Sequence, residues 1–321
     1  AIQGAAGSGK TSVALHRIAY LLYHDRENLK AANILILSPN NAFSDYISHI
    51  LPELGEEHIQ EMSFDLFAYK ELKEVANDCE DRYDYLEKKM KFQDSEWEIR
   101  FKEKQSASFI GQMEGFLAML EEDLVNIRSF TFKGFDKTEE EIIHLFYFKF
   151  QTVPLLARMD AVMEYLIDEY ETLRGKNISE EDMEALRETF QKMYVTTDLY
   201  EIYGWLLKDC GYPELSNAEY ERRKLEYEDV FPMLYLKYRL KGSRKHKNIK
   251  HLVIDEMQDY SYLQYSILSM LFHCRMTILG DRAQTMDSEC QDVTKFLPKI
   301  FGRKIRKIVM NEMKKNQSVR A

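Results

Sequence analysis

The residue types best suited to chemistry lie near the start of the chain, in a glycine-rich segment. Residues 4–11 have the sequence GAAGSGKT, which matches the phosphate-loop pattern G-x-x-x-x-G-K-[ST] in full. Glycines let the backbone wrap a phosphate closely, and the N–H groups of a following helix face the anion with the helix dipole behind them. We expect Lys10 to reach the β- and γ-phosphates of a nucleotide and the Thr11 hydroxyl to bind Mg²⁺. The predicted nucleotide contacts of this segment are Gly4, Gly7, Ser8, Gly9, Lys10 and Thr11.

Two adjacent carboxylates form the second candidate. Asp255 and Glu256 follow the apolar run 252–254. A carboxylate at the end of a buried strand is where a phosphate-loop ATPase holds its Mg²⁺, and a neighbouring carboxylate can orient and deprotonate the attacking water. We therefore assign Asp255 to the metal and Glu256 to the general base. A solvated acidic turn is the alternative, which the intact phosphate loop disfavours.

A glutamine ends the third polar segment. Residues 280–284 (GDRAQ) follow the apolar run 277–279. At the end of such a strand, Gln284 can contact the γ-phosphate and sense whether it is present, so we expect it to take part in catalysis. A plain strand-end turn would explain these residues as well.

The elements that must position these groups are short apolar runs typical of parallel strands buried on both faces. Residues 11–24 carry apolar side chains at helical spacing, without internal Gly or Pro, and predict a helix directly after the phosphate loop. The predicted strands are residues 1–3, 33–38, 251–255, 276–281 and 307–310. Strand, glycine turn, helix and strand begin a βαβ unit, and this context makes a chance glycine-rich turn a poor explanation of residues 4–11. Because the chain begins inside its first strand, we expect it to be a fragment.

The middle of the chain has a different pattern. Residues 67–241 are expected to be almost entirely helical, with helix starts at Thr138, followed by Glu141, and at Ser179, followed by Asp182. Aromatic residues in this block are able to stack on nucleic-acid bases, but aromatic stripes at helical spacing are mostly core.

The distribution of these patterns predicts the fold class and the domains. Strand signals at both ends of the chain predict one α/β domain, a parallel sheet flanked by helices, made of residues 1–66 and 246–321. The predicted α-helical insertion domain is residues 67–245.

Composition excludes several classes of protein. No run approaches the roughly 20 apolar residues of a membrane helix, and the glycine-rich start is unlike a secretory signal. The four cysteines, Cys79, Cys210, Cys274 and Cys290, are scattered without C-x-x-C spacing. That pattern argues against a zinc site or a disulfide framework. We expect a cytoplasmic protein with no membrane partner.

The net charge of −10 is unevenly distributed. Residues 71–240 carry 38 acidic and 23 basic residues, a net charge of −15, whereas residues 241–321 carry 8 acidic and 16 basic residues, a net charge of +8. Phosphates are repelled by the acidic middle, so the basic C-terminal segment is the better nucleic-acid surface. A solvated helical face is an equally good explanation of the acidic residues.

Together these motifs resemble those of the superfamily 1 helicases of the UvrD/Rep type. The phosphate loop continues into LHRIA at residues 15–19, residues 255–259 (DEMQD) are close to the group's DExQD, and residues 280–284 match its GDxxQ. The resemblance implies a RecA-like P-loop NTPase fold, with ATP and Mg²⁺ as cofactors and DNA, single-stranded or duplex, as partner. It also implies that Arg17 and Gln258 contact the nucleotide, Gln258 linking it to the nucleic-acid track.

Finer features resemble the HelD, or helicase IV-like, branch. Residues 36–40 (ILSPN) and 255–261 (DEMQDYS) are similar to that branch, in which the ATPase releases RNA polymerase from nucleic acid. Residues 38–41 (SPNN) and 63–65 (SFD) occupy the places of the group's DNA-contacting segments.

The sequence departs from the group in several places. Residues 285–289 (TMDSE) replace an aromatic-rich stretch that stacks on bases, and stacking contributes about 1–3 kcal/mol per base in single-strand binders. Lys315 stands about where an Arg is expected, and Lys lacks the two-pronged hydrogen bonding that suits a phosphate. The second motor domain, the upstream adenine-contacting Gln segment and an N-terminal coiled coil are absent from this sequence.

Two hypotheses of different class follow. The first is an ATPase motor fragment of a DNA helicase that translocates on nucleic acid or remodels complexes of RNA polymerase. It should hydrolyse ATP slowly by itself, because a second motor domain supplies cationic groups, and an arginine finger contributes about 10³–10⁵ in rate in related reactions. The alternative is a nucleotide-controlled binding module whose acidic insertion docks on RNA polymerase. A P-loop kinase would leave GDxxQ unexplained.

Overall fold

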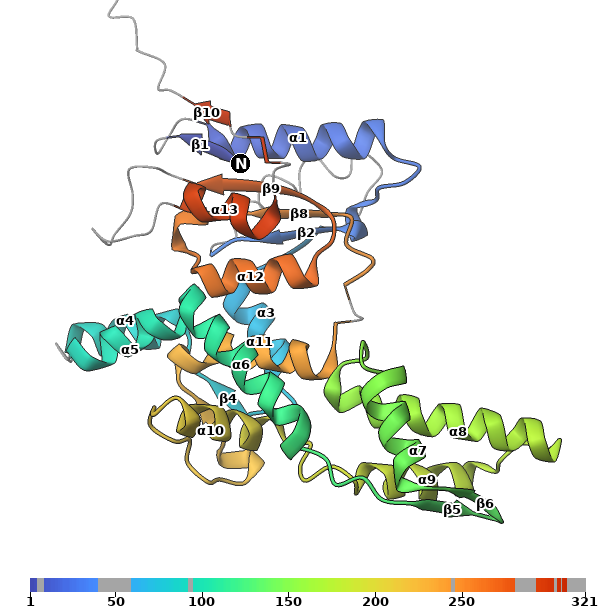
Figure 1. Cartoon of the computed structure of the whole chain (residues 1–321). Helices are drawn as coiled ribbons and strands as arrows, with labels where there is room; N and C mark the ends of the chain where they lie inside the picture. Colours follow the sequence, from blue (N-terminus) through green and yellow to red (C-terminus); the bar gives the residue numbers. More distant parts are fainter. Residues whose placement is uncertain are drawn as a thin grey trace, which may run out of the picture. The chain divides into compact units, whose positions relative to one another are not determined.

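The computed structural model describes residues 1–4, 9–39, 59–91, 95–243, 246–280, 293–302, 305–306 and 308–310 (Figure 1). The chain separates into two compact units. The first combines residues 1–71 and 244–321, and the second is formed by residues 72–243. None of the described helices is long and apolar enough to cross a membrane.

A parallel six-stranded sheet forms the centre of the first unit, in the order β10-β1-β9-β8-β2-β3. Its strands are β1 (Ile2–Gly4), β2 (Ile34–Leu37), β3 (Gln60–Met62), β8 (His251–Ile254), β9 (Arg275–Gly280) and β10 (Ile308–Met310). Every residue of β2 and β8 is buried, as expected for strands covered on both faces. The predicted α/β fold with a parallel sheet is confirmed.

Helices cover both faces of this sheet. The helical elements of the first unit are α1 (Lys10–His24), η1 (Ala31–Asn33), α3 (Phe64–Leu72), η6 (Met257–Asp259), α12 (Tyr262–Leu271) and α13 (Val293–Phe301). The inner face of α1 packs on one face of the sheet, where Leu15 and Ile18 join a core cluster with Ile36 and Val253. Helices α12 and α13 lie on the opposite face (Figure 1).

The second unit is mostly helical. Its helical elements are α4 (Arg82–Lys91), α5 (Ser95–Lys104), α6 (Ala107–Asp123), α7 (Glu139–His144), η3 (Leu145–Lys149), η4 (Leu155–Ala157), α8 (Arg158–Arg174), α9 (Glu180–Gln191), α10 (Leu199–Asp209), η5 (Tyr220–Arg222) and α11 (Tyr227–Lys241). The two predicted helix starts are confirmed: the Thr138 hydroxyl accepts from Glu141 N–H, and the Ser179 hydroxyl accepts from Asp182 N–H.

Two short strand pairs interrupt this unit, which was expected to be almost entirely helical. Strands β4 (Asp78–Cys79) and β7 (Lys224–Leu225) are parallel, whereas β5 (Phe130–Phe132) and β6 (Phe135–Lys137) form an antiparallel hairpin. The hairpin turn places Lys133 and Gly134 at φ values of 46° and 73°. Two successive positive φ angles are typical of the tight turns that join antiparallel strands.

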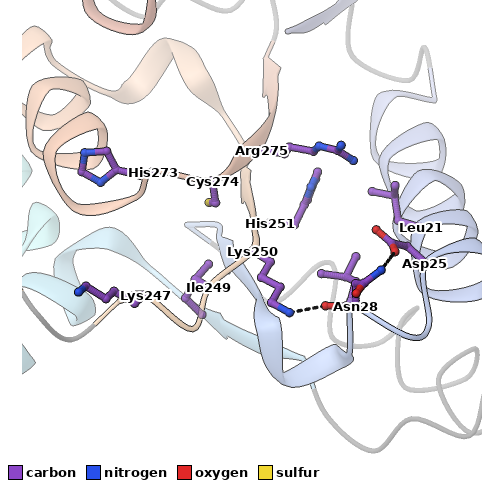
Figure 2. A pocket seen from close by; sticks show the side chains of 11 residues that line it. Leu21, Asp25, Asn28, Lys247, Ile249, Lys250, His251, His273, Cys274 and Arg275 are labelled. Carbon is purple, nitrogen blue, oxygen red and sulfur yellow. Dashed lines mark hydrogen bonds between the residues drawn. The ribbon is translucent and has the colours of Figure 1, made fainter.

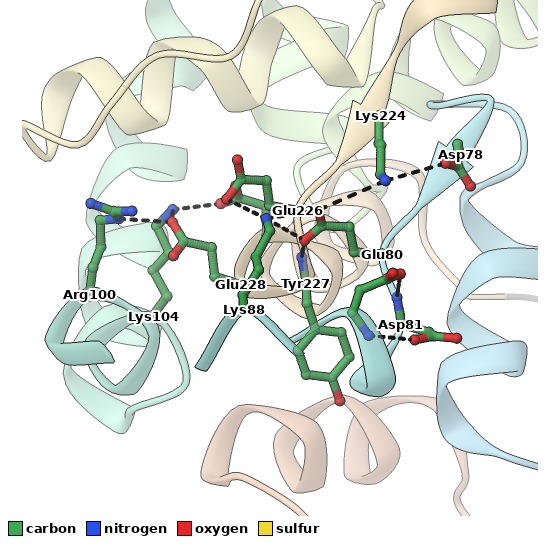
Figure 3. Close-up of polar contacts among 12 residues, drawn as sticks. Asp78, Glu80, Asp81, Lys88, Arg100, Lys104, Lys224, Glu226, Tyr227 and Glu228 are labelled. Carbon is green, nitrogen blue, oxygen red and sulfur yellow. Dashed lines mark hydrogen bonds and ion pairs between the residues drawn. The ribbon is translucent and has the colours of Figure 1, made fainter. Parts of the chain in front are cut away.

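A buried ionic network holds helices α5 and α11 of this unit together (Figure 3). The Lys104 ammonium, 1% exposed, donates to Glu228 at 2.7 Å and to Asp229 at 2.6 Å. The Tyr203 hydroxyl donates to Asp229 as well, and Arg100 donates to Glu228 at 3.0 Å. Burial raises the pKa of Asp229, and Lys104 opposes that shift. Each buried charge therefore has a partner, the condition under which such charges are tolerated.

Close packing at the end of β9 fixes the segment that follows β8. Gly280 lies against η6, so that an added Cβ atom would overlap the Met257 side chain and approach Gln258 Oε1 to 2.9 Å. The Tyr265 hydroxyl stabilises the same turn by donating a hydrogen bond to the Met257 carbonyl at 2.9 Å. The glycine is therefore required for steric reasons, and it sets the position of residues 256–258.

We predict that Gly280→Ala destabilises the protein by about 1–3 kcal/mol, because the added methyl group overpacks a contact between backbone and side chain. Thermal unfolding followed by circular dichroism measures the effect. Gly111→Ala is the matched control: its Cβ would meet nothing within 4 Å in the interior of α6, so that alanine should preserve or raise stability. An unchanged midpoint for Gly280→Ala would contradict the packing argument.

Candidate functional site

The parallel sheet brings the ends of the three strands that precede the candidate segments to one edge. Gln3 is in register with Gly280, and Ile254 is in register with Ile278, so β1, β9 and β8 end side by side. The chain leaves these strands toward the phosphate loop, the GDRAQ segment and the Asp-Glu pair. In open parallel sheets, ligands bind outside the carboxyl ends of the strands. This edge is therefore the candidate site.

Lys10 is the first residue of α1, the helix that starts at this edge. Gly9 precedes it with φ 81°, a left-handed conformation that favours glycine, and the carbonyl of Gly9 accepts from Val13 N–H. Lys10 and Thr11 are both half-buried. The positive charge of Lys10 lies close enough to Asp255 to lower its pKa. The helix start and the end of β8, 245 residues apart in sequence numbering, therefore meet.

Asp255 is a buried carboxylate, 7% exposed. Its N–H donates to the Leu37 carbonyl at 2.9 Å and extends the β2–β8 ladder by one residue. Residues 251, 253 and 255 alternate onto the same side of β8, and Val253 belongs to the core under α1. Asp255 therefore lies on the face of the sheet that α1 covers.

The surroundings of Asp255 strongly perturb its ionisation. Burial raises the pKa of Asp255 to about 6, and the Glu256 and Glu61 carboxylates act in the same direction. The Glu256 N–H, which donates to the carboxylate, and the Lys10 ammonium oppose the shift without cancelling it. A further cation at this position would offset the burial, so the carboxylate is suited to a metal ion. The contribution of Glu61, on β3, lies outside every motif of the sequence and was missed by the sequence analysis.

Glu256 has a strained backbone. Its φ and ψ of 50° and 51° are left-handed, and among the described residues only Lys133 shares a positive φ without being glycine. Such conformations persist where the surroundings enforce them and concentrate at functional sites. The Gln258 amide donates to Glu256 Oε2 at 2.6 Å, so the two side chains are positioned together. Gln258 itself is 9% exposed.

Arg17 lies two turns further along α1 and is exposed. Burial lowers the pKa of the Ala1 amino group and of His251, which stand at the beginnings of β1 and β8, and the charge of Arg17 adds to both shifts. Lys10 and Asp255 interact at the ends of the strands instead. The structure therefore does not bring Arg17 together with them, and its nucleotide contact stays a prediction.

Several predicted contact residues can be placed only in part. Gly4 ends β1, Ser38 is buried with its N–H on the Met62 carbonyl, and the Ser63 hydroxyl accepts from Leu66 N–H at the start of α3. The residues that lie outside the described part of the chain are Gly7, Ser8, Asn40, Asn41, Gln284 and Lys315.

The donor set suits one kind of metal. Within the described ranges, no three or more His, Cys, Asp or Glu side chains gather as a metal site. Mg²⁺ is usually held by one or two protein oxygens together with substrate phosphates, rather than by a cage of protein ligands. A hydroxyl at Thr11 and a carboxylate at Asp255 fit that mode of binding.

Comparison with known proteins adds a family. The model of the UvrD/REP helicase N-terminal domain matches residues 1–286. The comparison with individual curated proteins gives no match. The matched range contains the parallel strands β1, β2, β3, β8 and β9, the glycine-rich segment before α1, the Asp255-Glu256 pair and the whole second unit. The chain therefore belongs to the UvrD/REP helicase N-terminal domain family, a family of ATP-dependent helicase motors.

Proposed function

We propose that the first unit is the ATP-binding motor domain of a helicase and that residues 72–243 are a helical insertion in it. The observation that carries the proposal is the buried Asp255 at the shared edge of the sheet, with the start of α1 close enough for the charge of Lys10 to lower the pKa of Asp255. Lys10 offers a cation for phosphate oxygens, and Asp255 offers a carboxylate for a metal ion.

Each side chain has a distinct task in this proposal. The backbone N–H groups of Gly4, Gly7, Ser8 and Gly9 would bind the phosphates, Lys10 would neutralise their charge, and Thr11 and Asp255 would hold Mg²⁺. When bound, the metal would supply positive charge that offsets the negative charge developing during phosphoryl transfer. Glu256 takes the proton of the attacking water, while Gln258 orients the Glu256 carboxylate by the hydrogen bond already present.

The strained conformation of Glu256 supports its assignment as general base. Left-handed backbone at a bulky residue costs on the order of 1–3 kcal/mol. Here it turns the chain so that Asp255 remains under α1 while Glu256 leaves the strand, partly exposed and available to a water molecule. Gln284 would complete the site as the sensor of the γ-phosphate, a role that rests on the motif.

The track and the partner form a finer part of the proposal. The family supports nucleic acid as the track, and we propose single-stranded or duplex DNA. The HelD-like motifs support action on complexes of RNA polymerase, where the second unit would enter the basic nucleic-acid channel of the polymerase. Exposed acidic residues at two helix starts support that contact, with residues 139–141 at α7 and 180–181 at α9.

We predict that Lys10→Ala weakens Mg·ATP binding, whereas Glu256→Gln preserves binding and lowers the hydrolysis rate by about 10²–10⁴-fold, the usual contribution of a general base. Equilibrium binding of a fluorescent ATP analogue and release of inorganic phosphate measure the two effects separately. Glu27→Gln, an exposed carboxyl of the first unit, is the matched control. Hydrolysis at the wild-type rate in Glu256→Gln would refute the assignment of the base.

We predict that Asp255→Asn makes the nucleotide-free protein more stable above pH 6. Burial raises the pKa of Asp255 from 3.8 to about 6, and a shift of that size corresponds to a difference in the free energy of unfolding of up to about 3 kcal/mol. The folded state binds the proton of Asp255 more tightly than the unfolded state, so wild-type stability from this group is full below pH 4 and declines as the pH rises to 6. Denaturant unfolding at several pH values measures the difference between the two proteins.

The same variant should lose its stabilisation by Mg·ATP, because the carboxylate that holds the metal is gone. The titration of His251, whose pKa burial lowers to about 4, occurs in both proteins and cancels in the comparison. Equal stability of the two proteins at every pH would show that Asp255 is not the buried acid described above.

Charge reversal and the salt dependence of binding distinguish the two partner hypotheses. If the second unit binds the polymerase channel, reversing the exposed acids Glu180 and Glu181 should abolish pull-down of RNA polymerase and leave ATP hydrolysis unchanged. A helicase without such a partner should bind single-stranded DNA with strong salt dependence in gel shifts. Retention of polymerase by the reversed variant would exclude this docking surface.

A further inference from the structure

A second hollow lies at the opposite edge of the parallel sheet (Figure 2). It has a volume of about 500 Å³, which is within the range of small-ligand sites. His251 and Arg275, which line it, are the first residues of β8 and β9. Asp255 stands at the other end of β8, so this cavity is separated from the candidate ATP site by the length of the strand.

The cavity has an excess of positive charge. Lys250 and Arg275 line it and are exposed. The Arg275 backbone is paired in the β8–β9 ladder, but its guanidinium makes no hydrogen bond or ion pair with any residue that the structure describes. Lys250 donates to the Asn28 carbonyl at 2.5 Å, and an ammonium has further donors to offer. Arg275 and Arg17 add to the burial that holds the pKa of His251 near 4, so the imidazole stays neutral in this positive field.

The opposite wall has different chemistry. Leu21, in the last turns of α1, supplies apolar surface, and Asp25 follows that helix. The Asn28 amide donates to Asp25 Oδ1 at 2.9 Å, and the two side chains lie together beside the cavity (Figure 2). The carboxylate is an acceptor for hydroxyl and amino groups. A ligand with an anionic group at one end and a flat or hydroxylated group at the other would match both walls of the cavity.

We propose that this cavity binds a nucleoside monophosphate, with the phosphate on Arg275 and Lys250 and the sugar and base along Leu21, Asn28 and Asp25. The arginine supplies a two-pronged donor that matches phosphate geometry. Asp25 excludes a second phosphate group from its own side of the cavity by charge repulsion. The binding site is independent of the proposed ATPase function, since it shares no residue with the ATP site.

Isothermal titration calorimetry with AMP, GMP and inorganic phosphate tests the proposal. The background is the Lys10→Ala protein, in which the phosphate loop is impaired, so that any remaining binding reports the second cavity. We expect AMP or GMP to bind this protein and to bind more tightly than inorganic phosphate. Arg275→Ala in the same background should weaken nucleotide binding by about tenfold or more, since a charge-assisted contact contributes at least that factor.

Two controls keep the result interpretable. Lys299→Ala removes an equally exposed cation from α13, outside the cavity, and should leave binding unchanged. Arg275→Lys should restore part of the lost affinity, because the charge remains and the two-pronged geometry does not. The proposal is overturned if neither nucleotide binds at millimolar concentration. It is also overturned if inorganic phosphate binds as tightly as the nucleotides, or if Arg275→Ala and Lys299→Ala have equal effects.

Discussion

The burial of one carboxylate opposite one ammonium is the interaction on which the rest of this unit depends. Asp255 is withdrawn from water at the end of β8, and Lys10 alone does not compensate its charge, because the pKa remains raised. The surrounding elements enforce this arrangement: the β2–β8 ladder holds the backbone of Asp255, and the packing of α1 on the sheet holds Lys10. The unit thus stores an electrostatic cost at the place where a cation and phosphates would relieve it.

The second unit surrounds its buried carboxylates with a larger number of partners. Its buried carboxylates on α11 are matched inside the protein by Lys104 and Arg100, with the Tyr203 hydroxyl as an additional donor. Replacement of a single partner in such a network leaves an uncompensated charge in the interior, which is strongly destabilising. Burial still raises the pKa of Asp229 despite these partners, and Glu228 Oε2 has no hydrogen-bond partner among the described residues, so the difference from Asp255 is one of degree.

The central strands of the first unit were predictable because β2, β8 and the second half of β9 are buried and therefore appear as aliphatic runs, whereas the partly exposed β3, with the sequence QEM, has no such pattern and was missed. The runs that became β2, β8 and β9 were located within one or two residues. The β5–β6 hairpin was not predicted, since its three-residue strands are too short for an alternating pattern and lie among helical segments. The lining of the second cavity was also missed, because Asp25, Lys250 and Arg275 belong to no common motif. They lie together only in the folded chain, where the register of β8 and β9 sets the position of Arg275.

Strand β8 connects the second cavity, at His251, with the candidate ATP site, at Asp255. His251 and Asp255 are both buried, face the same side of the sheet and are four positions apart, about 13 Å along an extended chain. Over that distance water and salt would screen a charge almost completely, but the aliphatic side chains between them admit neither. An anion held beside His251 would therefore make ionisation of the distant carboxylate harder without moving an atom. Electrostatic coupling between the two ends of this sheet would then require only the low dielectric constant of its interior, and no hinge or lid.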